Sequence, residues 1–314
     1  MNNRPFLPLL IVSFLLGVFS CSENKTEEDL SNFRLEITNS LDKEWVDAFV
    51  LLSEKELFEN YSDFNPEGFV VYNKDVEIPS QYNSKGDEKG LAIVIPFIAA
   101  NETLSLTVSY DKDETIERDY PKRTQAELSH KFDGKFEERK YIGGEFRNVD
   151  KLHVPAEHTD HSWFIRYEGP GWESDKVGYR FYLDWRNGVD VFGKKVTENV
   201  LQNVGQDGFD SYHEMSDWGM DVLKVAKSLG IGSIATFENE LARRVDVTDS
   251  LYAEITNNGV IYSSILTKYF GWDIESGKTD LTSNISIHAG TRLTKQVLNS
   301  SAPIENFATG LIKD

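Results

Sequence analysis

Short stretches in which apolar and polar residues alternate recur along this chain, and they restrict it to folds built mainly from β-strands. Residues 33–38 and 104–110 alternate, which places their apolar side chains on one face of a half-buried strand. Residues 68–72 and 91–96 are two further strand candidates, and loops rich in Asn, Ser, Gly and Pro separate them. Residues 53–60 are the only helix-like stretch in this part of the chain.

The second half of the chain continues the β pattern. Its strand candidates are residues 162–168, 177–186, 251–255, 260–266, 283–288 and 307–312. The turn signals Gly169-Pro170-Gly171 and Asn257-Asn258-Gly259 lie between neighbouring candidates and predict two hairpins. Residues 217–229 fit either a short helix or a strand.

Pattern and charge together predict an all-β protein in two parts. Residues 31–112 contain enough short strands for a small N-terminal β-sandwich. Residues 111–123 are highly charged and are typical of a linker. Residues 113–314 are long enough for a larger, antiparallel sandwich.

The first 20 residues have the composition of a secretory signal peptide. Arg4 precedes an apolar run that is shorter than the roughly 20 residues a membrane-spanning helix needs. Ser20 and Cys21 follow, and a small residue before a cysteine is typical of the bacterial lipoprotein signal, although Phe19 is bulkier than usual there. We therefore expect residues 1–20 to be removed, Cys21 to carry lipid, and the protein to be anchored in the bacterial outer membrane. An uncleaved anchor, or a cysteine lost with the signal, is the alternative.

Residues 21–30 are polar and acidic, as expected of a solvated tether between the lipid and the fold. An acidic stretch directly after the cysteine is similar to the surface-export signals of some Bacteroidetes lipoproteins, and a plain flexible linker is the alternative. Neither interpretation decides whether the anchored protein faces the periplasm or the cell surface. Cys21 is the only cysteine, which excludes an intramolecular disulfide and CxxC metal or redox motifs.

The formal net charge of −19 argues against nucleic acid as a partner, because such binding depends on Lys and Arg neutralising phosphates. A high net charge favours solubility at the cell surface or in the periplasm. We expect contact with the membrane through the lipid anchor only.

Residues 177–186 carry the most informative polar pattern. As a strand, they place Tyr179, Phe181, Leu183 and Trp185 on a buried face. The opposite face then presents Arg180, Tyr182, Asp184 and Arg186. Arginines beside a phenol and a carboxylate suit a bidentate grip on a ligand carboxylate or on sugar hydroxyls, and the alternative is a salt-bridged outer face.

The preceding stretch, 162–168, adds Arg166 and Glu168 to the same predicted sheet face if the two strands form a hairpin. The loop between them contains Trp172 and Glu173. An exposed indole beside carboxylates is a common platform for a sugar ring, because its flat apolar face stacks on the ring while polar groups lie nearby. Simple packing of Trp172 in the loop is the alternative.

Two histidines, His158 and His161, come just before this stretch, with acidic residues nearby. Such a pair could ligate a metal, but its spacing matches no complete motif and no third ligand is identifiable. A histidine that acts as general acid or base is an equally good interpretation, and a hydrogen-bonded structural role is the commonest one. We predict neither a metal nor a cofactor. The remaining histidines treated as structural are His130, His153 and His288.

Residues 210–219 form a third polar cluster, between glycines that suggest a loop at a sheet edge. Its candidate ligand-binding residues are Asp210, Tyr212, Asp217 and Trp218, and His213 is a candidate acid or base. The chain has no GxSxG nucleophile elbow, no GxxxxGK[ST] phosphate loop and no HExxH zinc motif.

Two long runs resemble the Bacteroidetes domain-of-unknown-function family 4861. They are residues 165–187, IRYEGPGWESDKVGYRFYLDWRN, and residues 208–220, GFDSYHEMSDWGM. The resemblance covers most of the chain after Cys21. It implies a C-terminal fold similar to the galactose-mutarotase supersandwich and a role in polysaccharide utilisation, because similar domains are joined to unsaturated-uronide hydrolases. It carries no catalytic residues over to this chain.

The combined expectation is an enzyme that acts on uronic-acid-containing, pectin-like oligosaccharides as a lyase, hydrolase or epimerase. Arg166, Arg180 and Arg186 would hold the uronate carboxylate, and Trp172 and Trp218 would frame the ring. The expected acids and bases are His161, Glu168, Asp184 and His213. A glycan-binding protein without turnover and a mutarotase-like isomerase are the two alternatives.

Overall fold

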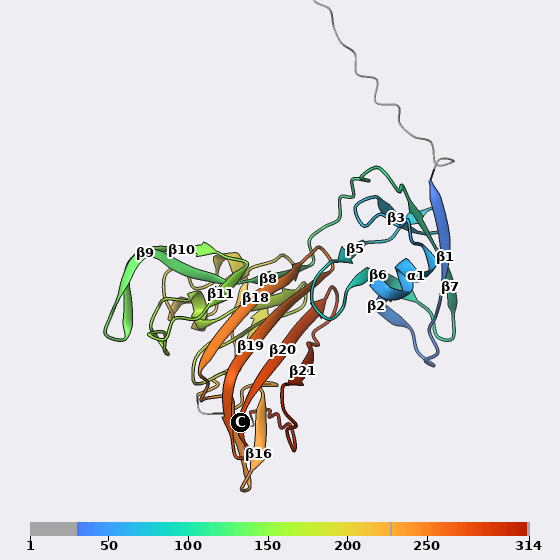
Figure 1. The fold of residues 1–314 in the computed structure, drawn as a ribbon. Coiled ribbons are helices and arrows are strands. Elements are labelled where there is room, and N and C mark those ends of the chain that lie inside the picture. Colours follow the sequence, from blue (N-terminus) through green and yellow to red (C-terminus); the bar gives the residue numbers. More distant parts are fainter. Residues whose placement is uncertain (1–29, 227, 313–314) are drawn as a thin grey trace, which may run out of the picture.

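The computed structural model describes residues 30–226 and 228–312 and confirms an all-β protein. The expected signal peptide and Cys21 lie outside the described residues. Within the described part, no helix has the length and apolar character needed to cross a membrane. Figure 1 shows β1 and α1 on one side of the molecule, the hairpin of β9 and β10 on the other, and the long strands β19 and β20 between them.

Residues 31–110 form two antiparallel sheets around one apolar core (Figure 1). The first sheet has the order β1 (Ser31–Thr38), β7 (Thr103–Tyr110), β3 (Phe69–Asn73) and β4 (Val76–Glu77). The second sheet has the order β2 (Trp45–Ser53), β6 (Gly90–Ile98) and β5 (Ser80–Asn83). Each strand predicted from the sequence in this part is therefore present.

The predicted helix is α1 (Glu54–Asn60), and its start follows from a capping box. The Ser53 hydroxyl accepts the backbone N–H of Glu56, and the Glu56 carboxylate accepts the backbone N–H of Ser53. These bonds satisfy donors that the first helical turn leaves without partners. The buried Leu57 fixes the helix on the core of the two sheets.

The second half of the chain builds a larger pair of five-stranded sheets. One sheet has the order β15 (Gly219–Asp221), β14 (Val189–Lys194), β13 (Gly178–Phe181), β12 (Gly171–Ser174) and β8 (Thr124–Glu127). The other has the order β11 (Lys151–His153), β18 (Ser250–Asn258), β19 (Tyr262–Ile274), β20 (Gly277–His288) and β21 (Lys295–Ser300).

A shared core holds these two sheets together. Trp172 and Phe181 from one sheet pack in the same buried cluster as Ile265 and Ile285 from the other. Two hairpins extend from the pair: β9 (Ser129–Glu137) with β10 (Lys140–Asn148), and β16 (Ala235–Glu238) with β17 (Leu241–Arg244). The predicted hairpin at Asn257–Gly259 is confirmed as β18 and β19.

Polar side chains fix the smaller pair of sheets on the larger one. The amide oxygen of Gln81 on β5 accepts the backbone N–H of both Ile261 and Tyr262, and its amide nitrogen donates to the Tyr262 carbonyl. The Arg123 guanidinium bridges Asp47 of β2 and Asp175, with N–O distances of 2.9 and 2.8 Å.

Four predictions about strands in the second half need correction. Residues 162–168 are not a strand but an irregular segment that ends in the 3₁₀ turn η2 (Arg166–Glu168). Strand β13 ends at Phe181 rather than at Arg186. Among the described residues of 217–229, the short strand β15 is the one regular element, and residues 307–312 form isolated bridges rather than a strand.

Left-handed backbone conformations explain why the alternation in 162–168 misleads. Trp163, Tyr167 and Glu168 have φ values of 57°, 37° and 70°, which a strand does not allow. The alternation also fails to predict which side chains are exposed here, because Arg166 and Glu168 are buried, as Ile165 is. The predicted hairpin of 162–168 with 177–186 is therefore wrong, and β12 pairs with β13 instead.

Candidate functional site

A cavity of about 430 Å³ with several charged side chains in its lining lies beside strands β13 and β14, and we call it the Arg180 cavity. Segments that are distant in the sequence contribute to its wall: the turn at 161–168, the strands β13 and β14, the turn η4 (Ser211–His213) and residues 223–226. The lining residues are His161, Glu168, Arg180, Tyr182, Arg186, Asp190, Phe209, Tyr212, His213, Leu223, Lys224, Val225 and Ala226.

Arg180 is the central cation of this cavity, and 1% of its surface is exposed. Its Nη2 donates to Asp190 Oδ2 at 2.9 Å and to Asp221 Oδ2 at 2.8 Å. Its Nη1 donates to the Tyr212 hydroxyl at 2.8 Å. A buried guanidinium needs such charged and hydrogen-bonded partners, because burial without them is costly.

Strand register explains how these charges meet. Arg180 on β13 lies directly opposite Asp190 on β14, and Phe192 on β14 lies opposite Asp221 on β15. Asp221 is thus the diagonal neighbour of Asp190 on the same sheet face, within reach of a long side chain.

The two aspartates compete for one guanidinium, and this changes the chemistry of Asp221. Burial, followed by the nearby negative charge of Asp190, raises the pKa of Asp221 to about 7, although Arg180 opposes the change. Asp190 also accepts the Tyr182 hydroxyl at 2.9 Å. Near neutral pH, the Asp221 carboxyl can therefore hold or release a proton.

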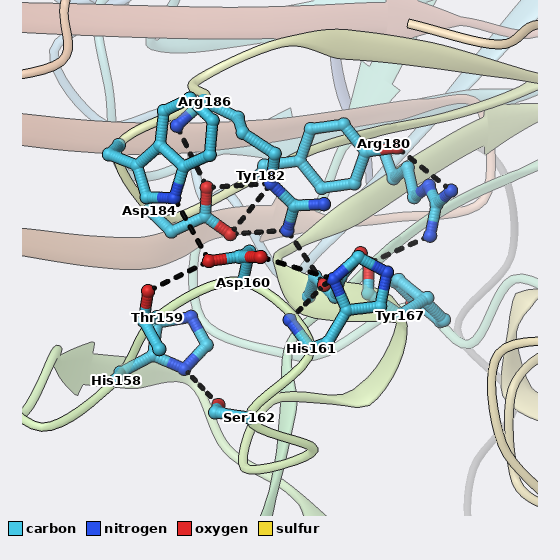
Figure 2. Close-up of polar contacts among 12 residues, drawn as sticks. His158, Thr159, Asp160, His161, Ser162, Tyr167, Arg180, Tyr182, Asp184 and Arg186 are labelled. Carbon is cyan, nitrogen blue, oxygen red and sulfur yellow. Dashed lines mark hydrogen bonds and ion pairs between the residues drawn. The ribbon is translucent and has the colours of Figure 1, made fainter. Parts of the chain in front are cut away.

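A second buried charge cluster joins Arg186 to two acids (Figure 2). The Arg186 Nη2 lies 2.6 Å from Glu168 Oε1, and Asp184 accepts from both the side chain and the backbone N–H of Arg186. The guanidinium also stacks on the Tyr182 ring, 4.0 Å from its centroid. Burial acts to raise the pKa of Glu168, but Arg186 outweighs it and the pKa is lowered, so Glu168 remains a carboxylate.

His161 carries one of two imidazoles that line the cavity. Its backbone N–H donates to Glu168 Oε1 at 2.7 Å, and its ring Nδ1 lies 3.3 Å from Asp160 and 3.9 Å from Glu168. Figure 2 shows the ring beside the Asp184–Arg186 cluster. The side chain is 63% exposed, so the ring is accessible to a ligand.

His213 carries the second imidazole, on the turn η4. Its Nδ1 lies 3.4 Å from Asp221 Oδ2, and its side chain is 44% exposed although that of Asp221 is fully buried. Burial, followed by the positive charge of Arg180, lowers the pKa of His213 below its usual 6.5. The ring is therefore neutral at pH 7, and a neutral imidazole accepts protons.

Asp160 connects His161 to residues outside the cavity (Figure 2). It accepts hydrogen bonds from Trp185 Nε1 at 3.0 Å and from the Thr159 hydroxyl at 3.0 Å. Burial acts to raise its pKa, but these bonds and the one from His161 lower it to about 2. Trp185 is 45% exposed, so the prediction that it faces the core is wrong, because the strand ends four residues earlier.

His158, a predicted ligand contact, is partly buried and does not line the cavity. Its Nδ1 lies 2.8 Å from the Ser162 hydroxyl, as Figure 2 shows. Burial lowers its pKa to about 4, so the ring is neutral. Its Nε2 is buried without a hydrogen-bond partner among the described residues.

Three further predicted contacts are buried in the structure and do not line this cavity. Arg166 is fully buried and donates to the carbonyls of Leu201, Gln202 and Val204 while it pairs with Glu127. An arginine that is fully buried and does not line the cavity cannot clamp a ligand there.

The prediction that Trp172 is an exposed sugar platform is wrong. It is 1% exposed on β12, stacks on Tyr179, and donates its Nε1 to Thr294. Its neighbour Glu173 is also buried, pairs with Lys194 at 2.6 Å, and accepts two backbone N–H groups. Both residues belong to a strand, and the expected exposed loop does not exist.

The polar cluster at 210–219 is only partly in the site. Tyr212 and His213 line the cavity, whereas Asp210 and Asp217 are exposed away from its lining. Trp218 packs edge-on against Phe192 beneath the site, with ring centroids 5.9 Å apart.

Asp190, Asp221, Phe209 and Lys224 are site residues that sequence reasoning missed. Asp190 had a usable signal, because it follows a predicted strand across a short turn, but its pairing with Arg180 depends on the register. In the part of the chain that the structure describes, no group of three or more His, Cys, Asp and Glu side chains could hold a metal.

Comparison with known proteins yields one family. A model of the family described as Domain of unknown function (DUF4861) matches residues 37–314. No curated protein and no solved structure matches the chain.

Proposed function

Since the chain belongs to the family described as Domain of unknown function (DUF4861), which assigns no activity, we propose a function from the Arg180 cavity itself. We propose an enzyme that moves protons to and from a sugar ring, in the class of sugar isomerases and epimerases. One observation carries this proposal: two accessible imidazoles, each beside a buried carboxylate, line the same cavity.

His213 is the proposed base, and Asp221 orients it. An Nδ1–H that faces Asp221 leaves Nε2 with its lone pair for a ligand hydroxyl. When His213 takes the proton of an anomeric hydroxyl, the carbonyl bond forms, the bond to the ring oxygen breaks, and His161 protonates that oxygen. Reclosure after rotation about the adjacent carbon–carbon bond returns both protons and gives the other anomer.

The carboxylates of the cavity favour this chemistry over glycoside hydrolysis. A glycosidase needs two carboxyl groups that reach the glycosidic bond from opposite sides. Here Glu168 is bound to Arg186, while Asp190 and Asp221 are bound to Arg180. Compared with these carboxylates, His161 and His213 remain accessible to a ligand.

The pairing of the three arginines supports a neutral sugar rather than the uronate that the sequence led us to expect. The predicted carboxylate clamp consists of Arg166, Arg180 and Arg186, and each has an acidic partner within the protein. A ligand carboxylate would therefore meet guanidinium groups that Glu127, Asp190, Asp221, Asp184 and Glu168 already neutralise.

Anomer exchange measured by proton NMR tests this proposal. The purified protein is expected to accelerate exchange between the α and β forms of at least one sugar in a panel of neutral aldoses, with galacturonate and glucuronate as acidic comparisons. Binding in calorimetry without exchange or any new product across the panel would instead indicate a glycan-binding protein. Acceleration only with the uronates would overturn the preference for a neutral sugar.

We also propose that the protein is a lipid-anchored protein of the outer membrane that takes part in polysaccharide utilisation. The support is the sequence around Cys21 and the acidic tether after it. Replacement Cys21→Ala is expected to abolish incorporation of labelled fatty acid and to move the protein from the membrane fraction to the soluble fraction. Equal membrane retention of this variant and the wild type would contradict the anchor.

A further inference from the structure

A second cavity, of about 410 Å³, lies where the smaller pair of sheets meets the larger one, and we call it the Trp45 pocket. It shares no lining residue with the Arg180 cavity among the described residues. Strand β2 of the smaller pair and strands β19 and β20 of the larger pair contribute to it. Its lining residues are Trp45, Phe49, Glu88, Tyr262, Ser286, Ile287, His288, Thr291, Leu293, Thr294 and Lys295.

Aromatic rings form one side of the Trp45 pocket. Phe49 stacks on Tyr262 and on His288, with centroid distances of 5.5 and 5.1 Å and interplanar angles of 16° and 13°. These packed rings give the pocket a rigid apolar surface. Trp45, at the start of β2, is 45% exposed, so its indole is available to a ligand.

Charged and polar groups form another side, and Glu88 organises them. Its carboxylate accepts from Lys295 Nζ at 2.8 Å, from the Tyr262 hydroxyl at 2.8 Å, and from Ser286 Oγ at 3.1 Å. Burial acts to raise the pKa of Glu88, but these partners outweigh it and lower the pKa. Lys295 thus has a neutralising partner, and two of its three N–H groups remain for a ligand.

His288 adds an acceptor to the pocket. Its Nδ1 lies 2.9 Å from the Ala289 carbonyl, which can only accept, so Nδ1 carries the proton and Nε2 is the acceptor. Burial lowers the pKa of His288, which keeps the ring neutral. The pocket therefore offers the Lys295 donor, the His288 acceptor, and the hydroxyls of Thr291 and Thr294, which do both.

We propose that the Trp45 pocket is a second carbohydrate-binding site, specific for a neutral glycan, in which one sugar ring stacks on Trp45 while its hydroxyls bond to Lys295 and His288. Each sugar hydroxyl both donates and accepts, which matches this mixed set of groups. A purely apolar ligand would leave those groups unpaired. An anion would gain little, because Glu88 neutralises the only lysine in the lining.

Because the Trp45 pocket is separate from the Arg180 cavity, its role would be to hold a glycan rather than to convert it. A ring held at the Trp45 pocket keeps a longer glycan on the protein while another part of it is processed or released, which raises the effective concentration of ligand. The inference does not depend on the activity of the Arg180 cavity, because a glycan can bind here whether or not that cavity is catalytic.

Isothermal titration calorimetry tests the second site with purified wild type and variants. The probes are cellotetraose, xylotetraose, galactotetraose and maltotetraose, with tetragalacturonate as the acidic comparison. At least one neutral tetrasaccharide is expected to bind, and Trp45→Ala is expected to lower its association constant by about tenfold or more, because the stacking surface is lost. Lys295→Met is expected to weaken binding of the same probe.

Matched variants keep the test decisive. Phe237→Ala removes an aromatic ring that is 54% exposed on β16, outside the Trp45 pocket, and is expected to bind as the wild type does. His213→Ala is also expected to retain this binding. The proposal is overturned if no neutral probe binds, if Trp45→Ala binds as tightly as the wild type, or if only tetragalacturonate binds.

Discussion

Replacing His213 by alanine is expected to lower the rate of anomer exchange by on the order of 100- to 10,000-fold, the usual contribution of a positioned general base. The ring is the accessible partner of the buried Asp221, at 3.4 Å, so its loss removes the group that accepts the hydroxyl proton. The measurement is the exchange rate by proton NMR on the best sugar of the panel, with circular dichroism to show that the variant is folded.

The pH profile of the same reaction has a predictable sign. A base must be unprotonated, and the pKa of His213 lies below its usual value of 6.5 because of burial and of the charge on Arg180. On the acidic side of the profile, the rate is therefore expected to fall as the pH drops below 6.5 through the lowered pKa of His213.

A histidine outside the site provides the control for this prediction. His153 is exposed on β11 and packs against Tyr252, away from the Arg180 cavity. His153→Ala is expected to exchange anomers at the wild-type rate. A fully active His213→Ala variant, or an equal loss in both variants, would remove His213 from the role of base.

Replacing Arg180 by methionine is expected to produce the largest loss of stability, about 3–5 kcal/mol at pH 8. The substitution leaves Asp190 and Asp221 buried without their shared cation. Urea unfolding followed by tryptophan fluorescence measures the change as a lower midpoint. Arg180→Lys keeps the charge but loses the planar fork that reaches both acids, so a smaller loss is expected.

Removing the Asp221 charge as well shows how much of the stability loss of Arg180→Met comes from electrostatics and how much from lost packing. The double variant Arg180→Met with Asp221→Asn is expected to be more stable at pH 8 than Arg180→Met alone, because one unpaired buried carboxylate is gone. If the two variants unfold at the same urea concentration, the cost of Arg180→Met comes from lost packing against Tyr182 and Tyr212 rather than from charge.

The dependence of wild-type stability on pH follows from Asp221. Its pKa rises from 3.8 to about 7 on folding, so the folded protein binds a proton that the unfolded chain has released between these values. The stabilisation that this proton provides is complete below pH 3.8 and is lost as the pH rises through about 7. Asp221→Asn is expected to remove this part of the pH dependence.

Local patterns were sufficient for much of the fold. The alternation in 33–38 and 104–110, the helix-like stretch 53–60, and the Asn-Gly turn before β19 each depend on neighbours in the sequence. The structure contains the predicted element in each case. The pattern failed at 162–168, where apolar and charged residues are equally buried and left-handed residues interrupt the chain.

The candidate site could be predicted only in part. His161, Glu168, Arg180, Tyr182, Arg186, Tyr212 and His213 were selected for their chemistry and line one cavity. Trp172 was selected for the same reason but is buried in the core. It packs in one cluster with Ile265 and Ile285 of the facing sheet, and this packing could not be predicted from its neighbours in the sequence.

By itself, the sequence determined the β-rich class of the chain and the residue types that gather near the site, since both depend on spacing along the chain and on side-chain chemistry. Only the tertiary structure decided what those residues can do. Strand register brought Asp190 and Asp221 against Arg180. Their carboxylates neutralise the guanidinium that the sequence analysis had expected to bind a ligand carboxylate. Burial then set the protonation of His213 and Asp221, and burial is a property of the whole fold rather than of any one segment.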